Sequence, residues 1–380
     1  MNIVYVYARD WPSEKAGISF STYTSYGMAK ADENNNIDLI IAKNTEKDFN
    51  EVLENYFMLK PLENFRVKLI DNKTLFSKTT KFYIKAFKMI KKLNQENKID
   101  AIVTRTVNFL PYAYLLKKLY NIKILYEAHT FYLDPELKGE VGKRKKETRF
   151  QRWFLPKIDG VICHQSVIKD LYKKYIPEQN YSVITYGFNE FVKQDNLWEK
   201  EYIGYIGSLY ESKGVKDLFY ALKDIEYKDL KLLIVGGRSH RIKEYQDLAK
   251  ELGIENRVKI TGWVDRDKVE KYLKQIKIGL VPLRDDFHTR YLTCPTKIFN
   301  YFSHGIPVIG ADLPTVKEVV TDKCGLFFEP GNREELVKCI NHLNSSPDIF
   351  NKYSNNIFNR SKELLLERRG EKIIDFIKSI

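Results

Sequence analysis

Short apolar runs alternate with helical segments along almost the whole chain, and this alternation constrains the fold more than any other feature. The expected strands of the first half are residues 3–7, 38–42, 66–70, 100–105, 123–129 and 158–164. Those of the second half are residues 202–206, 231–235, 257–264, 278–283 and 307–309. Segments with helical periodicity lie between several of these strands, at residues 20–30, 81–94, 111–120 and 215–223. Such a pattern predicts an α/β fold of doubly wound parallel sheets that bind ligands beyond the carboxyl ends of their strands.

The length and one polar stretch predict two domains. A chain of 380 residues exceeds one typical core, so two domains of roughly 180 residues are expected. We place the first domain at residues 1–188, a linker at 189–200 and the second domain at 201–362. Residues 360–380 form a charged amphipathic segment, which predicts a final helix.

Composition limits the partners and the compartment. The net charge of +13 can attract nucleic acid, anionic lipid or phosphorylated small molecules, although an A/T-rich genome would raise the lysine content without any function. We find no nucleic-acid motif and expect no specific nucleic-acid partner. No apolar run approaches the roughly 18 residues that span a bilayer, and residues 1–7 read as a strand rather than a signal peptide. Four scattered cysteines form no CxxC pair, so a reducing cytoplasm is expected.

A basic segment with aromatic residues occupies residues 138–157. It contains Lys143-Arg-Lys-Lys146, Arg149 and Arg152 beside Phe150, Trp153 and Phe154. A helix would place the three aromatic side chains on one face, and we expect that face to pack on the sheet. The alternative is contact with an anionic membrane through Lys143–Arg152, which would make the protein peripheral at the inner face of the membrane.

Residues 290–309 predict an anion site at a helix N-terminus. Pro295 suits the first helical position, Gly305 suits a left-handed C-cap, and residues 307–309 begin a strand. The free N–H groups of Thr296 and Lys297, together with the lysine side chain, would attract a phosphate. The alternative is an ordinary, well-capped helix.

Two features of the first half also lie where ligands bind in such sheets. Gly17 is in the loop between the first strand and its helix, although this loop is not a G-x-G-x-x-G motif. His129 follows the strand of residues 123–129, with Glu127 and Thr130 beside it. A purely structural histidine is the alternative there.

These motifs, in this order, resemble the retaining GT-B glycosyltransferases of family 4. The resemblance rests on Gly207-Ser-Leu, Lys213-Gly214, Leu233–Gly237, Gly262-Trp-Val264, Pro295–Tyr301, Gly305–Val308, Glu318 and Gly325–Gly331, and more loosely on Gly17, Tyr126–His129, residues 159–166 and 184–187. It implies two Rossmann-like domains facing a cleft, with the acceptor on the first and the nucleotide-sugar on the second. It also implies that the helix of about residues 363–380 crosses back to the first domain.

The resemblance further implies the roles of single residues. His129, beside the transferred sugar, and Lys213, on the diphosphate, would be the catalytic residues. The donor would be bound by Gly17, Ser208, Lys213, Arg238, Trp263, Val264, Pro295, Thr296, Lys297 and Asn300. Trp263 and Val264 would line the nucleobase. The resemblance implies no metal, no other cofactor and no carboxylate nucleophile, because lysine and the helix N-terminus would stabilise the leaving diphosphate.

The chain departs from the family pattern at three positions. Leu292 and Asn300 stand where two glutamates are usual, and Ser208 stands where many members have an arginine. The missing cation could come from Arg238, Arg284 or Arg290, and an inactive homologue is an alternative.

The sequence therefore predicts a retaining glycosyltransferase that moves a hexose or N-acetylhexosamine from a nucleotide-diphosphate sugar. We expect UDP rather than GDP, and a glycan or lipid-linked acceptor, as in cell-envelope polysaccharide synthesis. The alternatives are another GT-B enzyme, such as a nucleotide-sugar epimerase, or a non-catalytic basic binding protein.

Overall fold

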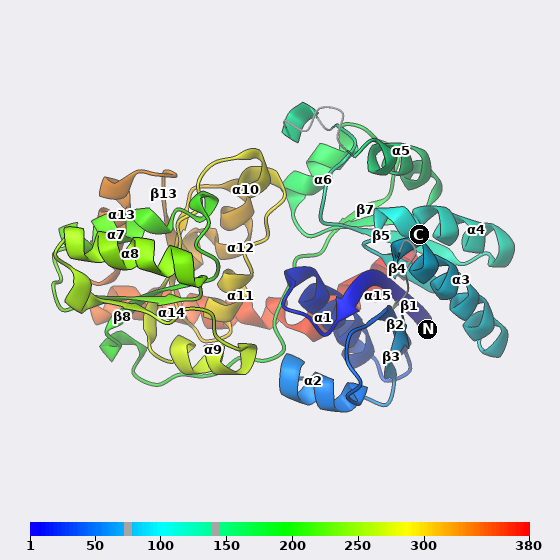
Figure 1. Ribbon diagram of the computed structural model, residues 1–380, viewed down its shortest axis with the longest axis horizontal. Helices are drawn as coiled ribbons and strands as arrows, with labels where there is room; N and C mark the ends of the chain where they lie inside the picture. The colour runs from blue at the N-terminus through cyan, green and yellow to red at the C-terminus, as the bar shows by residue number, and fades with distance from the viewer. Residues whose placement is uncertain (72–77, 135, 139–143) are drawn as a thin grey trace. The chain divides into compact units, whose positions relative to one another are not determined.

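The chain forms two compact units (Figure 1). The computed structural model describes residues 1–71, 78–134, 136–138 and 144–380. The first unit contains residues 1–189 and 365–380, and the second contains residues 190–364. Of the linker expected at residues 189–200, residues 190–200 belong to the second unit, where a 3₁₀ turn η4 (Leu197–Glu199) contacts its sheet.

A seven-stranded parallel sheet forms the centre of the first unit, in the order β3-β2-β1-β4-β5-β6-β7. Its strands are β1 (Asn2–Trp11), β2 (Asn36–Lys43), β3 (Phe65–Ile70), β4 (Ala101–Thr104), β5 (Lys123–Ala128), β6 (Gly160–Cys163) and β7 (Tyr181–Val183). The central strands are apolar on both faces because helices cover both, as in other parallel sheets. The strand order reverses between β1 and β4, which is where doubly wound sheets bind ligands.

Seven helices belong to the described part of the first unit. They are α1 (Ala16–Ala31), α2 (Phe49–Phe57), α3 (Lys78–Glu96), α4 (Leu110–Tyr120), α5 (Lys145–Phe154), α6 (Ser166–Lys173) and α15 (Leu366–Ser379). Short 3₁₀ turns are η1 (Val107–Phe109), η2 (Glu136–Lys138) and η3 (Leu155–Lys157).

Helix α15 packs along α1, although more than 300 residues separate them in the sequence. The two backbones approach closely at two glycines. A Cβ atom on Gly27 would lie 2.2 Å from the carbonyl oxygen of Leu366, and one on Gly370 would lie 2.0 Å from that of Gly27. Leu366, Ile373 and Ile377 are buried in the core of the first unit, so α15 is part of that core.

A six-stranded parallel sheet, in the order β10-β9-β8-β11-β12-β13, forms the centre of the second unit. Its strands are β8 (Tyr202–Ile206), β9 (Lys231–Val235), β10 (Val258–Ile260), β11 (Ile276–Val281), β12 (Val308–Ala311) and β13 (Gly325–Phe328). Its helices are α7 (Val215–Asp224), α8 (Ser239–Glu251), α9 (Arg266–Leu273), α10 (Phe287–Tyr291), α11 (Thr296–Phe302), α12 (Pro314–Cys324), α13 (Arg333–Leu343) and α14 (Pro347–Ser361). The 3₁₀ turns are η4, η5 (Glu211–Lys213), η6 (Glu255–Arg257) and η7 (Lys362–Leu364). The order reverses between β8 and β11.

The two doubly wound parallel sheets confirm the predicted fold class, with two local corrections. Helix α11 begins at Thr296, so Pro295 is its extended N-cap rather than its first helical residue. In the basic segment only Lys145–Phe154 is α-helical, and residues 139–143 lie outside the described part. Phe154 of that helix is buried, but Trp153 is 63% exposed, so the predicted packing of all three aromatics was wrong. Among the described residues, none of the helices combines the length and apolarity that crossing a membrane requires.

Candidate functional site

In the second unit, glycines bring the loops after β8 and β9 together at the carboxyl edge of the sheet. Gly207 follows β8 with a φ of +136°, and Gly236 follows β9 with a φ of +124°. A Cβ atom on Gly236 would lie 2.3 Å from the carbonyl oxygen of Gly207. The positive φ favours glycine at both turns, and the close approach also excludes a side chain at Gly236.

Lys297 of α11 points into the loop after β8. Its side chain is buried, with Nζ 3.8 Å from the ring centroid of Tyr205. The same Nζ lies 3.6 Å from the position that a Cβ atom on Gly207 would occupy. The Tyr205 hydroxyl donates a hydrogen bond to the carbonyl of Ser208 (2.6 Å), which fixes the loop against the ring. A lysine held over an aromatic face at a glycine turn is suited to an anion that approaches the turn.

Lys213 is the second cation of this edge. It ends η5, and Gly214 follows in the left-handed region (φ +65°), where a Cβ atom would lie 1.7 Å from the carbonyl oxygen of Pro282. The loop after β8 is therefore pressed against the end of β11. Burial lowers the pKa of Lys213, and Asp286 partly opposes that effect.

The two lysines repel each other. Burial and the charge of Lys213 hold the pKa of Lys297 well below its usual range. Within the described ranges no carboxylate lies within 4.0 Å of Lys297. An anion bound here would favour the charged form of Lys297 and offset the repulsion.

Two of the positions where the chain departs from the family pattern differ in their surroundings. Leu292 is 4% exposed, so it is a core side chain rather than a substitute for a sugar-binding glutamate. Asn300 is only partly buried, and its carbonyl accepts a hydrogen bond from Ser303 Oγ (2.9 Å). Its side-chain amide is therefore the better placed of the two to contact a ligand.

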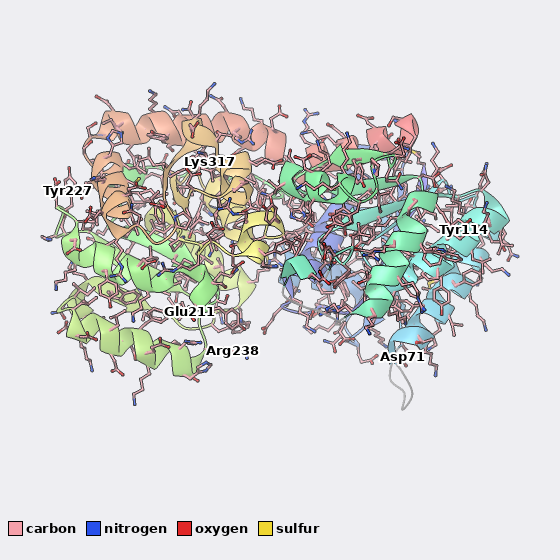
Figure 2. The ribbon with its side chains drawn as sticks, turned by 90° about the horizontal axis from the view of Figure 1, so that it is seen from above. Asp71, Tyr114, Glu211, Tyr227, Arg238 and Lys317 are labelled. Carbon is pink, nitrogen blue, oxygen red and sulfur yellow. The ribbon has the colours of Figure 1, made fainter. Side chains whose placement is uncertain are left out.

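The three arginines considered as a substitute cation are also in different surroundings. Arg284 pairs with the buried Asp217 at 2.8 Å, and Arg333 pairs with the same carboxylate at 3.1 Å. Arg290 forms a two-pronged pair with Asp285. Arg238 is exposed, and the described part of the chain gives it no ion pair (Figure 2). Arg238 is thus the arginine most available to a ligand.

Trp263 and Val264 lie after β10, beyond the paired glycines Gly236 and Gly262. Trp263 is 56% exposed and Val264 is partly buried. An exposed aromatic ring beside two glycine turns could stack on a base.

In the first unit, Glu127 lies at the centre of a buried polar cluster at the carboxyl edge. It is fully buried at the end of β5, accepts a hydrogen bond from the Tyr5 hydroxyl, and pairs with Arg369 at 3.1 Å. Burial opposes the charge of Glu127, but Arg105, Arg369 and Tyr5 together hold its pKa below its usual value. Arg369 also donates to Thr24 Oγ1 (3.1 Å) and the Thr185 carbonyl (2.7 Å).

His129 lies beside this cluster. Its Nδ1 is 3.5 Å from the Glu127 carbonyl, and burial together with Arg105 holds its pKa well below the usual value. His164 follows β6, contacts the Ala128 carbonyl through Nδ1 (3.1 Å), and stacks on Tyr186. Burial lowers the pKa of His164 to about 4, so both imidazoles are neutral at pH 7. A neutral imidazole can hydrogen-bond a sugar hydroxyl without adding charge.

The structure shows a packing reason for glycine at position 17 that the sequence did not suggest. A Cβ atom on Gly17 would lie 2.4 Å from the Tyr7 hydroxyl oxygen, so a side chain would displace that ring. The expected approach of a phosphate to Gly17 remains a prediction.

Sequence reasoning missed Arg105 and Arg369. Arg105 follows β4 at the strand-order reversal, and the rule that ligands bind there could have identified it. Arg369 could not be identified, because only the return of α15 brings it to Glu127, 242 positions earlier.

Both halves of the chain match known domain families. Residues 31–190 match Glycosyltransferase Family 4, and residues 200–346 match Glycosyl transferases group 1. The chain belongs to the family 4 glycosyltransferases.

Curated relatives are distant but extend over long stretches. The alpha-monoglucosyldiacylglycerol synthase of Streptococcus pneumoniae is 23% identical over 365 residues, which cover 89% of this chain and 77% of that protein. An uncharacterized glycosyltransferase of Methanocaldococcus jannaschii is 24% identical over 208 residues, covering 47% of this chain and 51% of that protein.

Solved structures share the GT-B fold of this glycosyltransferase. HepE of Anabaena in complex with UDP has a TM-score of 0.75 at 17% identity, with each chain covered completely. Sucrose-phosphate synthase of Thermosynechococcus elongatus has a TM-score of 0.72 at 16% identity, covering 100% of this chain and 98% of that one. The family and fold thus agree with the resemblance seen in the sequence, while the roles of single residues remain predictions.

Proposed function

We propose that this protein is a retaining glycosyltransferase that transfers a hexose or N-acetylhexosamine from a UDP-sugar to a glycan or lipid-linked acceptor of the cell envelope. The family and the GT-B fold support transferase activity. The UDP and UDP-glucose complexes of HepE support a uridine donor, and the streptococcal relative is named for a glycolipid product. In this proposal the donor is bound by Ser208, Lys213, Arg238, Trp263, Val264, Pro295–Lys297 and Asn300.

The observation that carries the proposal is the pair Lys213 and Lys297. A buried lysine with a strongly lowered pKa, beside a second lysine and a glycine turn, is an incomplete charge arrangement. A diphosphate would complete it, because its negative charge favours the protonated form of Lys297 and would be stabilised by both ammonium groups.

The same pair favours the chemical step. When the sugar–phosphate bond breaks, negative charge grows on the leaving diphosphate, and cations already in position stabilise that charge. In this proposal the acceptor hydroxyl attacks from the face of the departing phosphate, which takes the hydroxyl proton. The configuration at the sugar is retained without a carboxylate nucleophile, and no metal is needed.

His129 would contact the transferred sugar. Its lowered pKa keeps it neutral, so it can hydrogen-bond a sugar hydroxyl but cannot act as a cation. The buried Glu127 beside it would fix the backbone that positions the ring.

The variant Lys213→Ala tests the proposal. We expect transfer from UDP-glucose to fall by about a hundredfold or more, while the melting temperature stays near that of the parent protein. Lys216→Ala is the matched control, since Lys216 is an exposed lysine three positions further along. Turnover of Lys213→Ala at the parent rate would exclude the proposed role.

An epimerase is the second candidate, since it would bind the same donor. Incubation with UDP-glucose and no acceptor separates the two, because an epimerase isomerises the donor and a transferase leaves it intact. Transfer that continues in EDTA would support the metal-free proposal.

The surface formed by α4 and α5 supports contact with an anionic membrane. Exposed Leu115, Leu119 and Trp153 lie among basic residues, and Lys157 Nζ is 3.7 Å from the Trp153 ring centroid. We expect co-sedimentation with vesicles that contain phosphatidylglycerol but not with pure phosphatidylcholine, and Trp153→Ser should weaken it. Equal binding to both vesicles would remove the electrostatic part of this proposal.

A further inference from the structure

The loop of residues 130–134 follows β5 at the carboxyl edge of the first sheet, and α5 holds its backbone. The Tyr132 N–H donates a hydrogen bond to Gln151 Oε1 (2.8 Å). Arg152 Nη2 donates to the Leu133 carbonyl (2.8 Å). Two adjacent side chains of one helix therefore fix two adjacent residues of the loop.

The helix α6 and the residue Tyr175 just beyond it hold the remaining residues of the loop. The Tyr172 hydroxyl donates to the Thr130 carbonyl. The buried Phe131 ring packs edge-on against Tyr172 and Tyr175, with centroid distances of 5.2 Å and 5.4 Å. The Tyr175 hydroxyl donates to Asp134 Oδ2 (2.7 Å). Every residue of the loop thus has a partner on α5, on α6 or at Tyr175.

Gln151 joins these two sets of contacts. Its side chain is fully buried, and Nε2 donates to the Tyr172 hydroxyl (2.7 Å) while Oε1 holds Tyr132. Nε2 also lies 3.4 Å from the hydroxyl of Tyr126 in β5. The Tyr172 hydroxyl therefore accepts from Gln151 and donates to Thr130. Buried polar groups are costly unless they are hydrogen-bonded, so this network favours a single arrangement of the loop.

The position of His129 depends on that arrangement. His129 lies between β5 and the loop, directly before Thr130. Among the described residues its ring makes one side-chain hydrogen bond, a long one of 3.5 Å from Nδ1 to the Glu127 carbonyl. The backbone of the neighbouring residues, more than the contacts of the ring, therefore determines where the imidazole lies.

We propose that Gln151 is a positioning residue for His129 in the transfer reaction, an inference that rests on the role proposed above for His129. Gln151 is fully buried, so it acts through the loop rather than on the sugar. It holds Tyr132 directly and Thr130 through Tyr172, and so sets the position from which the imidazole would bond a sugar hydroxyl. A displacement of about 1 Å in a group that orients the substrate can lower the rate by about a hundredfold.

The variant Gln151→Met tests this role, because methionine has the length of glutamine but lacks its amide. We expect kcat for transfer from UDP-glucose to fall by about tenfold or more. The KM for UDP-glucose should stay at the parent value, because the proposed donor-binding residues belong to the second unit.

Gln179→Met is the matched control. The Gln179 amide also holds a loop of the first unit, by donating to the carbonyls of Leu155 and Ile158, but this loop precedes β6 at the amino edge of the sheet. We expect parent kcat and KM in this variant. A loss of kcat equal to that of Gln151→Met would show that loosening any loop of the unit lowers activity, and would overturn the proposal.

A double-mutant cycle with His129→Ala separates positioning from a general structural role. If Gln151 acts through His129, adding Gln151→Met to His129→Ala should change kcat by less than about twofold, since coupled residues are not additive. If the two losses multiply in the double variant, Gln151 acts independently of His129 and the proposal is wrong.

The proposed function and this inference fail in different ways. If His129→Ala keeps the parent kcat, the role proposed for His129 is wrong, and Gln151 has no catalytic group to position. If His129→Ala loses activity while Gln151→Met keeps the parent kcat, only the positioning role is wrong.

A second variant keeps the test valid if Gln151→Met fails to fold. Tyr172→Phe removes the hydroxyl between Gln151 and Thr130 but keeps the ring that packs on Phe131. We expect faster hydrogen exchange at the Tyr132 amide and a fall in kcat of about threefold or more, as for one buried hydrogen bond. Parent values of both in Tyr172→Phe would overturn the proposal.

Discussion

The carboxyl edges of the two sheets handle buried charge in different ways. In the first unit, Glu127 is held between Tyr5 and Arg369, so most of the buried charge is neutralised within the protein. In the second unit, Lys213 repels the charge of Lys297, and no carboxylate among the described residues is in contact with Lys297. The buried charge of the first edge is therefore held by protein partners, whereas the second edge has two cations that we propose an anion neutralises.

Glu127→Gln removes the buried carboxylate that pairs with Arg369, and we expect the largest effect on stability from this variant. The change leaves Arg369 and Arg105 without a buried counter-charge, so the free energy of unfolding should fall by about 3–5 kcal/mol. Urea unfolding measures the loss. In the control Glu201→Gln an exposed pair with Lys231 is lost, and the expected cost is below about 1 kcal/mol. Equal losses in the two variants would mean that the buried ion pair stabilises the fold no more than the exposed one.

Lys297→Met should have the opposite effect on stability. Removing a buried, repelled charge should raise the free energy of unfolding of the ligand-free protein. The rate of sugar transfer should fall by about a hundredfold. Urea unfolding without UDP and turnover with UDP-glucose give the two readouts. Lys223→Met, at an exposed position of α7, controls for the added methionine. A Lys297→Met protein that loses both stability and activity would show that the lysine is a structural element.

The sequence predicted each edge to a different extent. Lys213 and Lys297 could be named as candidates because both belong to local loop and helix motifs, and their roles remain predictions. The ion pair between Arg369 and Glu127 was not predicted, because Arg369 meets Glu127 only after α15 has packed on α1. No local sequence pattern carries that information. Local periodicity also failed for Trp153, whose exposure depends on how much of its helix the neighbouring elements cover.

The two edges should also respond to pH in opposite ranges. Lys297 has a lowered pKa in the folded protein, so above that pKa the unfolded chain binds more protons and stability rises with pH, up to about 10.4. UDP affinity should fall over the same range, because Lys297 loses its charge. Urea midpoints and UDP titrations at pH 7 and 9 measure both trends, and Lys297→Met should flatten them.

His164 should govern the acidic range in the first unit. Burial lowers its pKa to about 4, below the value of roughly 6.5 in an unfolded chain. Stability should therefore be lost as pH falls from about 6.5 toward 4, because the unfolded chain binds the proton more readily. His164→Phe should reduce this loss in acid unfolding curves, and an unchanged pH profile would assign it to another group.

Asn300→Ala should have the smallest effect. If the amide hydrogen-bonds the donor ribose, UDP affinity should fall by about two- to tenfold, as for one neutral hydrogen bond. Calorimetric titration with UDP measures the change. Asn356→Ala in α14 is the control, and no change in Asn300→Ala would exclude this contact.

The position of α15 has a consequence for synthesis on the ribosome. Residues 1–189 emerge long before residues 365–380, which supply both a buried face of the same core and the arginine that braces Glu127. Until those residues emerge, the nascent first unit exposes the apolar groove that α15 later fills and holds Glu127 without its main partner. We expect this half to finish folding last although it is made first, and to need protection from aggregation while the second unit is still being translated.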